Sequence, residues 1–333
     1  MEISVGPARA RELILGIPPL VMEHEFVPLE RAYGRVLARD VTAGIPIPPF
    51  DRSMYDGYAL MSADTLEASA DNPATLRVAG EIPAGSVPQT GITRGQAMKI
   101  LTGAPMPGGA DAAVKYEATR GSGGTVSVFA SARAGDGVAY AGSRVWRGGA
   151  AARAGDVISP ETAGLLASIG LTTAEVFRRP VAAIINTGSE LSQPGQPLPP
   201  AKIYSSGAVT LIGRLGELGV DGYNAGIVRD DPGEIASAIM EHLPRCDVVI
   251  TTGGASSGDY DFARCAARRL GANALFWKLD VMPGGAMLAS EYGGKLVLAL
   301  SGSPGAAVLG LTRIAAPFLL RLTGRAEYGG VDG

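Results

Sequence analysis

The stretch Asp247–Asp261, DVVITTGGASSGDYD, joins an apolar run to a glycine-rich loop. Residues 247–252 are mostly β-branched and carry one charge, which predicts a buried strand. The loop that follows has two interpretations. Its segment GASSG satisfies G-x-S-x-G, the nucleophile elbow of serine hydrolases. The same glycines also suit a loop that binds a phosphate at the end of a strand.

The two histidines of the chain, His24 and His242, decide between these interpretations. A hydrolase of the elbow type needs a histidine later in the chain than its serine. Both histidines precede Ser256, so a Ser-His-Asp triad on that serine is excluded. We therefore interpret the loop as a phosphate-binding loop.

Outward from this loop, strand patterns alternate with helix patterns. Strands are predicted at 181–186, 223–230, 247–252 and 295–300, and helices at 205–219, 232–243, 260–271 and from Ser303 onward. This alternation predicts a doubly wound, mostly parallel sheet with helices on both faces.

Ligands of such sheets bind beyond the carboxyl ends of the strands. Polar and glycine residues follow every predicted strand, and four such loops on one edge favour a binding site. Glycine, serine and aspartate also simply make turns, which explains any single loop. The predicted ligand-binding and phosphate-binding residues are Thr187, Gly188, Gly253, Gly254, Ser256, Gly258, Ser301, Gly302, Ser303 and Pro304.

The N-terminal half has a different pattern. Residues 46–140 contain short β-type runs between glycine and proline turns, which predicts a small β-rich domain. Residues 1–45 together with 141–178 are predicted to form a mixed α/β segment, an elongated linker and dimer domain. The α/β domain is assigned to residues 179–324, and residues 325–333 to a tail.

Composition excludes several classes of protein. The net charge is −3 and aromatic residues make up 6%, so neither a basic nucleic-acid surface nor single-strand stacking is expected. Two cysteines, Cys246 and Cys265, are too few for a disulfide framework and are expected to be reduced. The N-terminus does not have the pattern of a signal peptide, and no run of about 18 apolar residues is apparent, so a cytoplasmic protein without a membrane span is expected.

Six motifs resemble those of one enzyme family and occur in that family's order. They are IPPFDRSMYDGYAL (47–60), ILTGAPMPGGADAAVKYE (100–117), INTGSELSQPGQPLP (185–199), VRDDP (228–232), ITTGGASSGDYDF (250–262) and LSGSPGAAVLG (300–310). Together with VPLERAYGRVLARDVTA near the start, they are similar to the molybdopterin molybdenumtransferases. The resemblance covers about residues 5–324 and implies the molybdopterin-binding fold.

The resemblance implies an enzyme of molybdenum cofactor synthesis that inserts molybdate into adenylylated molybdopterin and releases AMP. It also implies a homodimer, in which the ligand lies between the α/β domain of one subunit and the N-terminal domains of the other. Magnesium is the expected metal ion, since carboxylates and phosphates supply the oxygen ligands that it prefers.

The resemblance also assigns roles to single residues. Backbone amides of Gly253, Gly254 and Ser256 are expected to bind the phosphates. The expected magnesium ligands are Glu190, Asp230 and Asp261, and the expected catalytic residues are Asp56, Thr102, Asp261 and Lys278. Three alternatives remain open: helix capping for the acids, a solvated lysine at 278, and a tight Asp-Gly turn at 56.

The sequence departs from the family pattern at several points. A Lys-Pro-Gly-Lys-Pro segment is usual where this chain has Met282–Ala286, so two lysines are absent. Members typically continue into a small C-terminal β domain beyond the region of resemblance. The leading interpretation is a divergent molybdopterin molybdenumtransferase that inserts molybdate. These departures motivate a second hypothesis, a non-catalytic carrier or sensor that binds molybdopterin or a nucleotide. A third is another substrate, such as tungstate or a different nucleotide-activated pterin.

Overall fold

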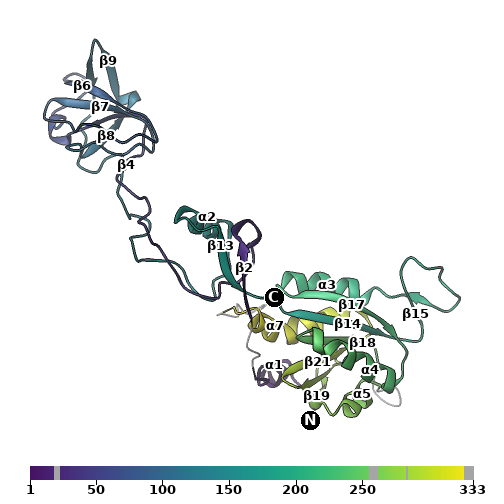
Figure 1. Ribbon diagram of the computed structural model, residues 1–333. Helices are drawn as coiled ribbons and strands as arrows, with labels where there is room; N and C mark the ends of the chain where they lie inside the picture. Colours follow the sequence, from purple (N-terminus) through teal and green to yellow (C-terminus); the bar gives the residue numbers. More distant parts are fainter. Residues whose placement is uncertain (19–22, 255–261, 283, 326–333) are drawn as a thin grey trace. The chain divides into compact units, whose positions relative to one another are not determined.

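The computed structural model describes residues 1–18, 23–254, 262–282 and 284–325. The chain divides into two compact units (Figure 1). The α/β unit contains residues 1–39, 153–163 and 172 to the end of the chain, and the β-rich unit contains residues 40–152 and 164–171.

A seven-stranded sheet, counted over the described residues, forms the centre of the α/β unit. In spatial order its strands are β1 (Glu2–Val5), β19 (Asn273–Leu279), β20 (Leu288–Tyr292), β21 (Lys295–Leu300), β18 (Val248–Thr252), β14 (Val181–Thr187) and β17 (Asp221–Val228). Only β20 runs antiparallel to its neighbours in this set. The predicted mostly parallel sheet is therefore confirmed.

Helices cover both faces of this sheet. On one face, α1 (Pro7–Leu15), α3 (Gly207–Glu217), α6 (Pro304–Gly310) and α7 (Ala316–Leu322) share an apolar core with the strands, and on the other face α4 (Pro232–His242) and α5 (Phe262–Leu270) do the same. Each helix buries one apolar stripe, such as Leu211 and Leu215 of α3. This is the doubly wound arrangement expected from the sequence.

The first residues of the chain belong to this unit. Strand β1 pairs in parallel with β19, and α1 lies on the same side of the sheet as α7 (Figure 1). The guanidinium of Arg321 donates to the carbonyls of Leu15 and Ile17 at 2.7 and 2.8 Å, which satisfies acceptors at the C-terminal end of α1. The sequence-based boundaries instead grouped residues 1–45 with 141–178.

One helix of the α/β unit is long and apolar enough to meet the length and composition test for a membrane span. The continuous helix Pro304–Leu322 has 19 residues and a mean hydropathy of 1.4, so its length and composition alone would allow a membrane span. In the structure 56% of that window is buried, and Leu311, Phe318 and Leu319 pack into the sheet core. Its apolar character is explained by packing inside the α/β unit.

A buried ion pair joins two strands of this unit at their N-terminal ends. The Asp247 carboxylate accepts from Arg178 at 2.9 and 3.0 Å and from the Val181 amide at 2.7 Å. Burial raises the pKa of Asp247, but these donors outweigh it, and the net pKa lies below the ordinary value. Asp247 is 7% exposed, so its charge depends on these partners.

The β-rich unit contains a six-stranded sheet, counted over the described residues. In spatial order its strands are β8 (Ala112–Lys115), β5 (Gly57–Leu60), β7 (Gln96–Ile100), β6 (Ala74–Ile82), β10 (Thr125–Val128) and β9 (Thr119–Ser122). Separate apolar clusters centred on Leu60 and on Ile100 pack around this sheet. The sequence predicted this small β-rich domain.

Candidate functional site

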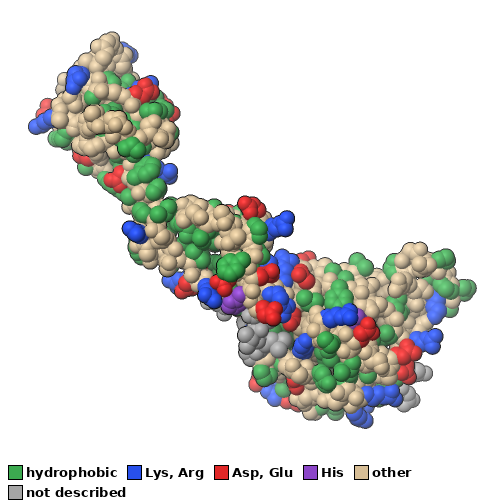
Figure 2. Space-filling model, viewed as in Figure 1, with side chains coloured by type: hydrophobic (Ala, Val, Ile, Leu, Met, Phe, Trp, Pro, Cys, Tyr) green, Lys and Arg blue, Asp and Glu red, His purple; other side chains and the backbone are tan. Residues whose placement is uncertain are grey.

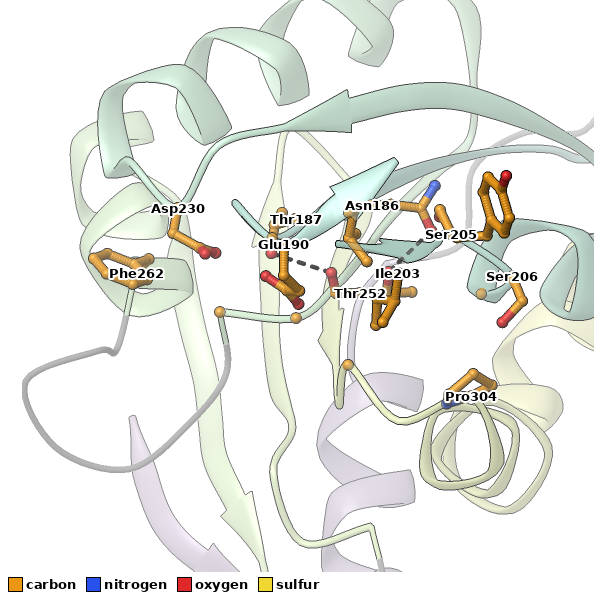
Figure 3. Close-up of a pocket in the computed structure, with 17 residues that line it drawn as sticks. Asn186, Thr187, Glu190, Ile203, Ser205, Ser206, Asp230, Thr252, Phe262 and Pro304 are labelled. Atoms are coloured by element: carbon orange, nitrogen blue, oxygen red, sulfur yellow. Dashed lines mark hydrogen bonds between the residues drawn. The ribbon is translucent and has the colours of Figure 1, made fainter. Parts of the chain in front are cut away.

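A pocket of about 380 Å³ opens beyond the carboxyl ends of β14 and β18 (Figure 3). Its lining residues are Asn186, Thr187, Gly188, Glu190, Leu191, Ile203, Tyr204, Ser205, Ser206, Gly207, Asp230, Thr252, Gly253, Gly254, Phe262, Gly302 and Pro304. We call this cavity the strand-end pocket. It brings together residues from four predicted loops, as the rule for parallel sheets requires.

The glycine loop after β18 is shaped by contact with β14. Gly253 has φ +94°, and a Cβ there would lie 2.4 Å from the carbonyl oxygen of Thr187. Only glycine fits this position without displacing the backbone. The Gly253 amide was expected to bind phosphate, but it donates instead to the Leu300 carbonyl at 3.0 Å. Gly253 therefore sets the path of the loop, and Gly254 comes next along the pocket wall.

Buried polar side chains fix the ends of the two strands relative to each other. The Thr187 hydroxyl donates to the Thr252 carbonyl at 3.1 Å, and the Thr252 hydroxyl donates to Asn186 Oδ1 at 3.2 Å. Asn186 also donates to the Gly226 carbonyl at 3.2 Å. This network gives the floor of the pocket a rigid geometry.

The N-terminus of α3 forms another wall of the pocket. Ser205, Ser206 and Gly207 line the cavity, and the side chain of the N-cap residue Ser206 makes no capping hydrogen bond. The N-terminal amides and the helix dipole favour an anion at this position. Ser205 is only 8% exposed, so its hydroxyl group lies in a largely enclosed part of the site. The sequence had indicated a serine at this helix start but not its place in the pocket.

Two carboxylates face the same pocket. Glu190 follows β14 and Asp230 follows β17, and both are labelled in Figure 3. Asp230 Oδ2 accepts from the Ser189 amide at 3.0 Å, which holds the loop after β14 against the loop after β17. Asp231, rather than Asp230, caps α4 by accepting from Gly233 and Glu234. Asp230 therefore does not have the helix-capping role that the sequence left open.

The predicted metal set is only partly described. Glu190 and Asp230 lie in one pocket, whereas Asp261, Ser256 and Gly258 lie outside the described residues. Among the residues that the structure does describe, no group of three or more His, Cys, Asp or Glu side chains is arranged to hold a metal ion. Two carboxylates beside a phosphate pocket still fit magnesium, which commonly uses one or two carboxylates with phosphate oxygens and water.

Lys278, Ser301 and Ser303 lie at a neighbouring cavity of about 700 Å³. The loop 301–304 separates the two cavities, since Gly302 and Pro304 line the strand-end pocket. Lys278 has φ +70°, an unfavourable conformation for a residue with a side chain, and its Nζ lies 4.2 Å from the centre of the Trp277 ring. The unfavourable backbone conformation and the contact with the Trp277 ring argue against an ordinary solvated lysine at position 278.

Asp56 and Thr102 lie in the β-rich unit and contact each other directly. Asp56 Oδ1 accepts from the Thr102 amide at 2.6 Å and from its hydroxyl at 2.7 Å. These bonds, the amide bond first, lower the pKa of the exposed Asp56 carboxyl, which stays ionised. The sequence placed these residues in different motifs and did not predict their contact.

Pocket residues missed in the sequence share no single chemical type. They are Asn186, Leu191, Ile203, Tyr204, Ser205, Ser206, Gly207, Thr252 and Phe262. Ile203 and Tyr204 lie next to each other in the sequence, and Phe262 lies across the pocket from Ile203 in Figure 3. Apolar and aromatic side chains of this kind can pack against a flat heterocycle. Only the position of Asn186, Thr252 and the two serines beside predicted strand or helix ends offered a signal in the sequence.

Comparisons with known proteins agree with this architecture. Residues 4–170 match the family "MoeA N-terminal region (domain I and II)", and residues 183–321 match "Probable molybdopterin binding domain". The molybdopterin molybdenumtransferase of Bacillus subtilis is 36% identical over 89% of this chain and 70% of its own length. Molybdopterin molybdenumtransferase 2 of Mycobacterium tuberculosis is 34% identical over 85% of this chain and 71% of its own length.

Solved structures lead to the same family. A molybdopterin biosynthesis MoeA protein from Pyrococcus horikoshii superposes with a TM-score of 0.83 at 30% identity, over 98% of this chain and 81% of that one. Two family models and curated relatives thus match this chain along most of its length. The chain belongs to the molybdopterin molybdenumtransferase family.

Proposed function

We propose that this protein is an enzyme of molybdenum cofactor biosynthesis that inserts molybdate into adenylylated molybdopterin and releases AMP. The observation that carries the proposal is the strand-end pocket. It combines an uncapped helix N-terminus, a glycine loop and two carboxylates at one sheet edge. Such a site suits a phosphorylated ligand that is accompanied by a divalent cation.

The residues of the pocket have distinct tasks in this proposal. The first turn of α3 and the Ser205 hydroxyl stabilise phosphate oxygens, and this stabilisation grows as negative charge develops on the departing AMP. Ile203 and Tyr204 supply side chains against which an aromatic ring of the ligand packs. The hydrogen-bonded strand ends below keep this arrangement rigid.

Magnesium would be held by Glu190 and Asp230, whose carboxylates share the pocket with the phosphate-binding groups. When bound, the ion would neutralise negative charge on the phosphate oxygens and so favour the departure of AMP. Without it, two carboxylates next to a phosphate would repel the ligand. These two side chains therefore make ligand binding depend on the cation.

Lys278 is the cation that we assign to the molybdate side of the site. It lines the neighbouring cavity beside Ser301 and Ser303, on the other side of the loop 301–304 from the strand-end pocket. A dianion such as molybdate would receive one positive charge and two hydroxyl donors there. The strained backbone at Lys278 supports a functional rather than a structural role.

The active form in this proposal is a cytoplasmic homodimer, with Asp56 and Thr102 of one subunit completing the site of the other. Large apolar side chains of the β-rich unit are exposed, including Met54 (53%), Tyr140 (49%) and Trp146 (69%). Exposed side chains of this size favour association. Light scattering should give twice the chain mass of 34.0 kDa, and a monomer at micromolar concentration would contradict the dimer.

Activity is tested by anaerobic incubation with adenylylated molybdopterin, molybdate and Mg²⁺, with AMP release as the readout. A relative of established activity serves as the positive control, and Glu190→Gln as the impaired variant. We expect molybdate-dependent AMP release by the wild type. If the protein binds AMP but releases none from adenylylated molybdopterin, while the control enzyme is active, it is a non-catalytic binding protein instead.

The shared site is tested by mixing two variants that are each inactive. Asp56→Asn and Glu190→Gln carry their defects in different units. If each active site uses both residues from different subunits, randomly mixed dimers regain about a quarter of the wild-type activity. If the mixture stays inactive although subunits exchange, the two residues do not act in one site across the dimer.

A further inference from the structure

A third cavity of the α/β unit lies beside the last helix, which contains a proline. A π-helical turn, η5 (Leu311–Ala315), precedes α7, and Pro317 lies in the first turn of α7. Pro317 has no N–H, so it cannot donate to the Arg313 carbonyl as a regular helix requires. Arg11 Nε of α1 donates to this carbonyl at 2.7 Å instead. The Arg11 guanidinium is thereby fixed in orientation.

The two arginines lie on the wall of one cavity of about 490 Å³. Its lining residues are Pro7, Arg11, Leu279, Val281, Met282, Gly284, Leu309, Gly310, Arg313 and Ile314. No aspartate or glutamate is among them. Within the described ranges, Arg11 makes no side-chain bond besides the one to the Arg313 carbonyl, and the Arg313 guanidinium makes none. Among the residues that the structure describes, neither guanidinium is therefore paired with a carboxylate.

The remainder of the wall is apolar. Leu279, Val281 and Leu309 line it together with Met282, whose side chain is 96% exposed at the rim. Asp280 lines the neighbouring 700 Å³ cavity and not this one. A volume of this size, mostly apolar and with a few converging polar groups, is typical of sites for small organic molecules.

We propose that this cavity, here called the two-arginine cavity, binds an organic anion with a phosphate monoester or carboxylate on an apolar body. Two guanidinium groups match a phosphate or carboxylate through paired N–H donors, and apolar surroundings strengthen that attraction. The apolar wall buries the body of the ligand. An inorganic oxyanion would leave most of this volume unfilled.

None of the residues that line the two-arginine cavity belongs to the strand-end pocket, whereas Leu279, Val281, Met282 and Gly284 also line the cavity beside Lys278. Arg11 and Arg313 line the two-arginine cavity alone, so the inference is tested separately from AMP release. Val281, Met282 and Gly284 come from the region where the family's two lysines are absent. In this chain Arg11 of α1 and Arg313 of η5 line the cavity together with these three residues.

Calorimetric titration of the full chain with 1-naphthyl phosphate tests the proposal. We expect 1-naphthyl phosphate to bind at least about tenfold more tightly than either inorganic phosphate or neutral 1-naphthalenemethanol. Arg313→Met should weaken binding by about tenfold without unfolding the protein, since that side chain makes no hydrogen bond within the described residues. Arg9→Met is the matched control on the same helix, where Arg9 pairs with Glu2 and Glu12 outside the cavity.

Competition with AMP separates this cavity from the strand-end pocket. Under the proposal, saturating AMP leaves the affinity for 1-naphthyl phosphate unchanged. Displacement by AMP, equal affinity in wild type and Arg313→Met, or no binding at all would overturn the inference. These outcomes are independent of the AMP-release assay, so either proposal can fail alone.

Discussion

Replacing Gly253 by alanine tests the geometry of the strand-end pocket most sharply. At φ +94° an alanine costs about 1–2 kcal/mol relative to glycine. Its Cβ would also lie 2.4 Å from the Thr187 carbonyl oxygen, and relief of such a backbone overlap costs about 1–3 kcal/mol. The lower entropy of the unfolded chain returns about 0.4–1 kcal/mol. We therefore expect a net loss of roughly 1–5 kcal/mol.

The loss should be confined to the α/β unit, and the two tryptophans of the chain allow this to be measured. Trp277 lies in the α/β unit and Trp146 in the β-rich unit, so a Trp146→Phe background leaves one reporter. Urea unfolding followed by Trp277 fluorescence gives the free energy of unfolding. AMP affinity, measured by calorimetry, should fall by about tenfold or more as the loop moves.

Gly216→Ala is the matched control. Gly216 lies in α3, has no positive φ, and a Cβ there would meet no atom within 4 Å. This change should stabilise the helix by up to about 1 kcal/mol and leave AMP binding unchanged. The reasoning is refuted if Gly253→Ala unfolds at the wild-type urea concentration and binds AMP with wild-type affinity.

Three further predictions concern charged groups. The pKa of Asp247 is lowered on folding from an ordinary value of 3.8, so the ionised carboxylate stabilises the folded protein fully well above that pH, and this stabilisation is lost as the pH falls through the folded pKa. Asp247→Asn should lower the free energy of unfolding by about 2–3 kcal/mol at pH 7 and flatten its dependence on acid pH. Urea unfolding of the variant that matches the wild type between pH 7 and 3 would contradict this prediction. Thr102→Val should raise the pKa of Asp56 toward its ordinary value in a carboxyl NMR titration, whereas an unshifted curve would show that the hydroxyl contributes nothing. Glu190→Gln should weaken Mg²⁺-dependent AMP binding by about tenfold in calorimetry, and equal affinity would remove Glu190 from the metal site.

Much of the α/β unit could be predicted because its central strands and helices have strong, uninterrupted patterns. The runs at 181–187, 248–252 and 295–300 are buried on both faces, so their sequences are almost wholly apolar. The edge strand β1 and the pair β19 and β20 were missed. β1 has four residues, and β19 mixes exposed and buried positions without a clear alternation.

Residues of the strand-end pocket could be predicted only where the strand that precedes them was itself predicted. Gly188, Glu190, Asp230 and Gly254 share the strand-end pocket because they directly follow parallel strands. Ser205 and Tyr204 come from the far end of a long loop, and only folding brings that loop back over the strands. The amide of Gly253 looked available for phosphate, but its bond to Leu300 depends on the order of the strands in space.

The two-arginine cavity could not be foreseen for a similar reason. Arg11 and Arg313 are separated by 302 positions, and their contact arises because α1 packs beside the last helix. Pro317 gives a hint in the sequence, since a proline within a helical pattern leaves a carbonyl without its usual donor. Which donor replaces it depends on tertiary packing. Charges of both signs are interspersed on the face of this unit that Figure 2 shows.

The central claim is that the strand-end pocket binds the nucleotide part of the substrate. A crystal structure of the protein with AMP and Mg²⁺ tests it directly. We expect the phosphate at the first turn of α3 beside Ser205 and the Gly254 loop, with the metal ion at Glu190 and Asp230. AMP bound elsewhere on the chain, with this pocket empty at saturating nucleotide, would contradict the account.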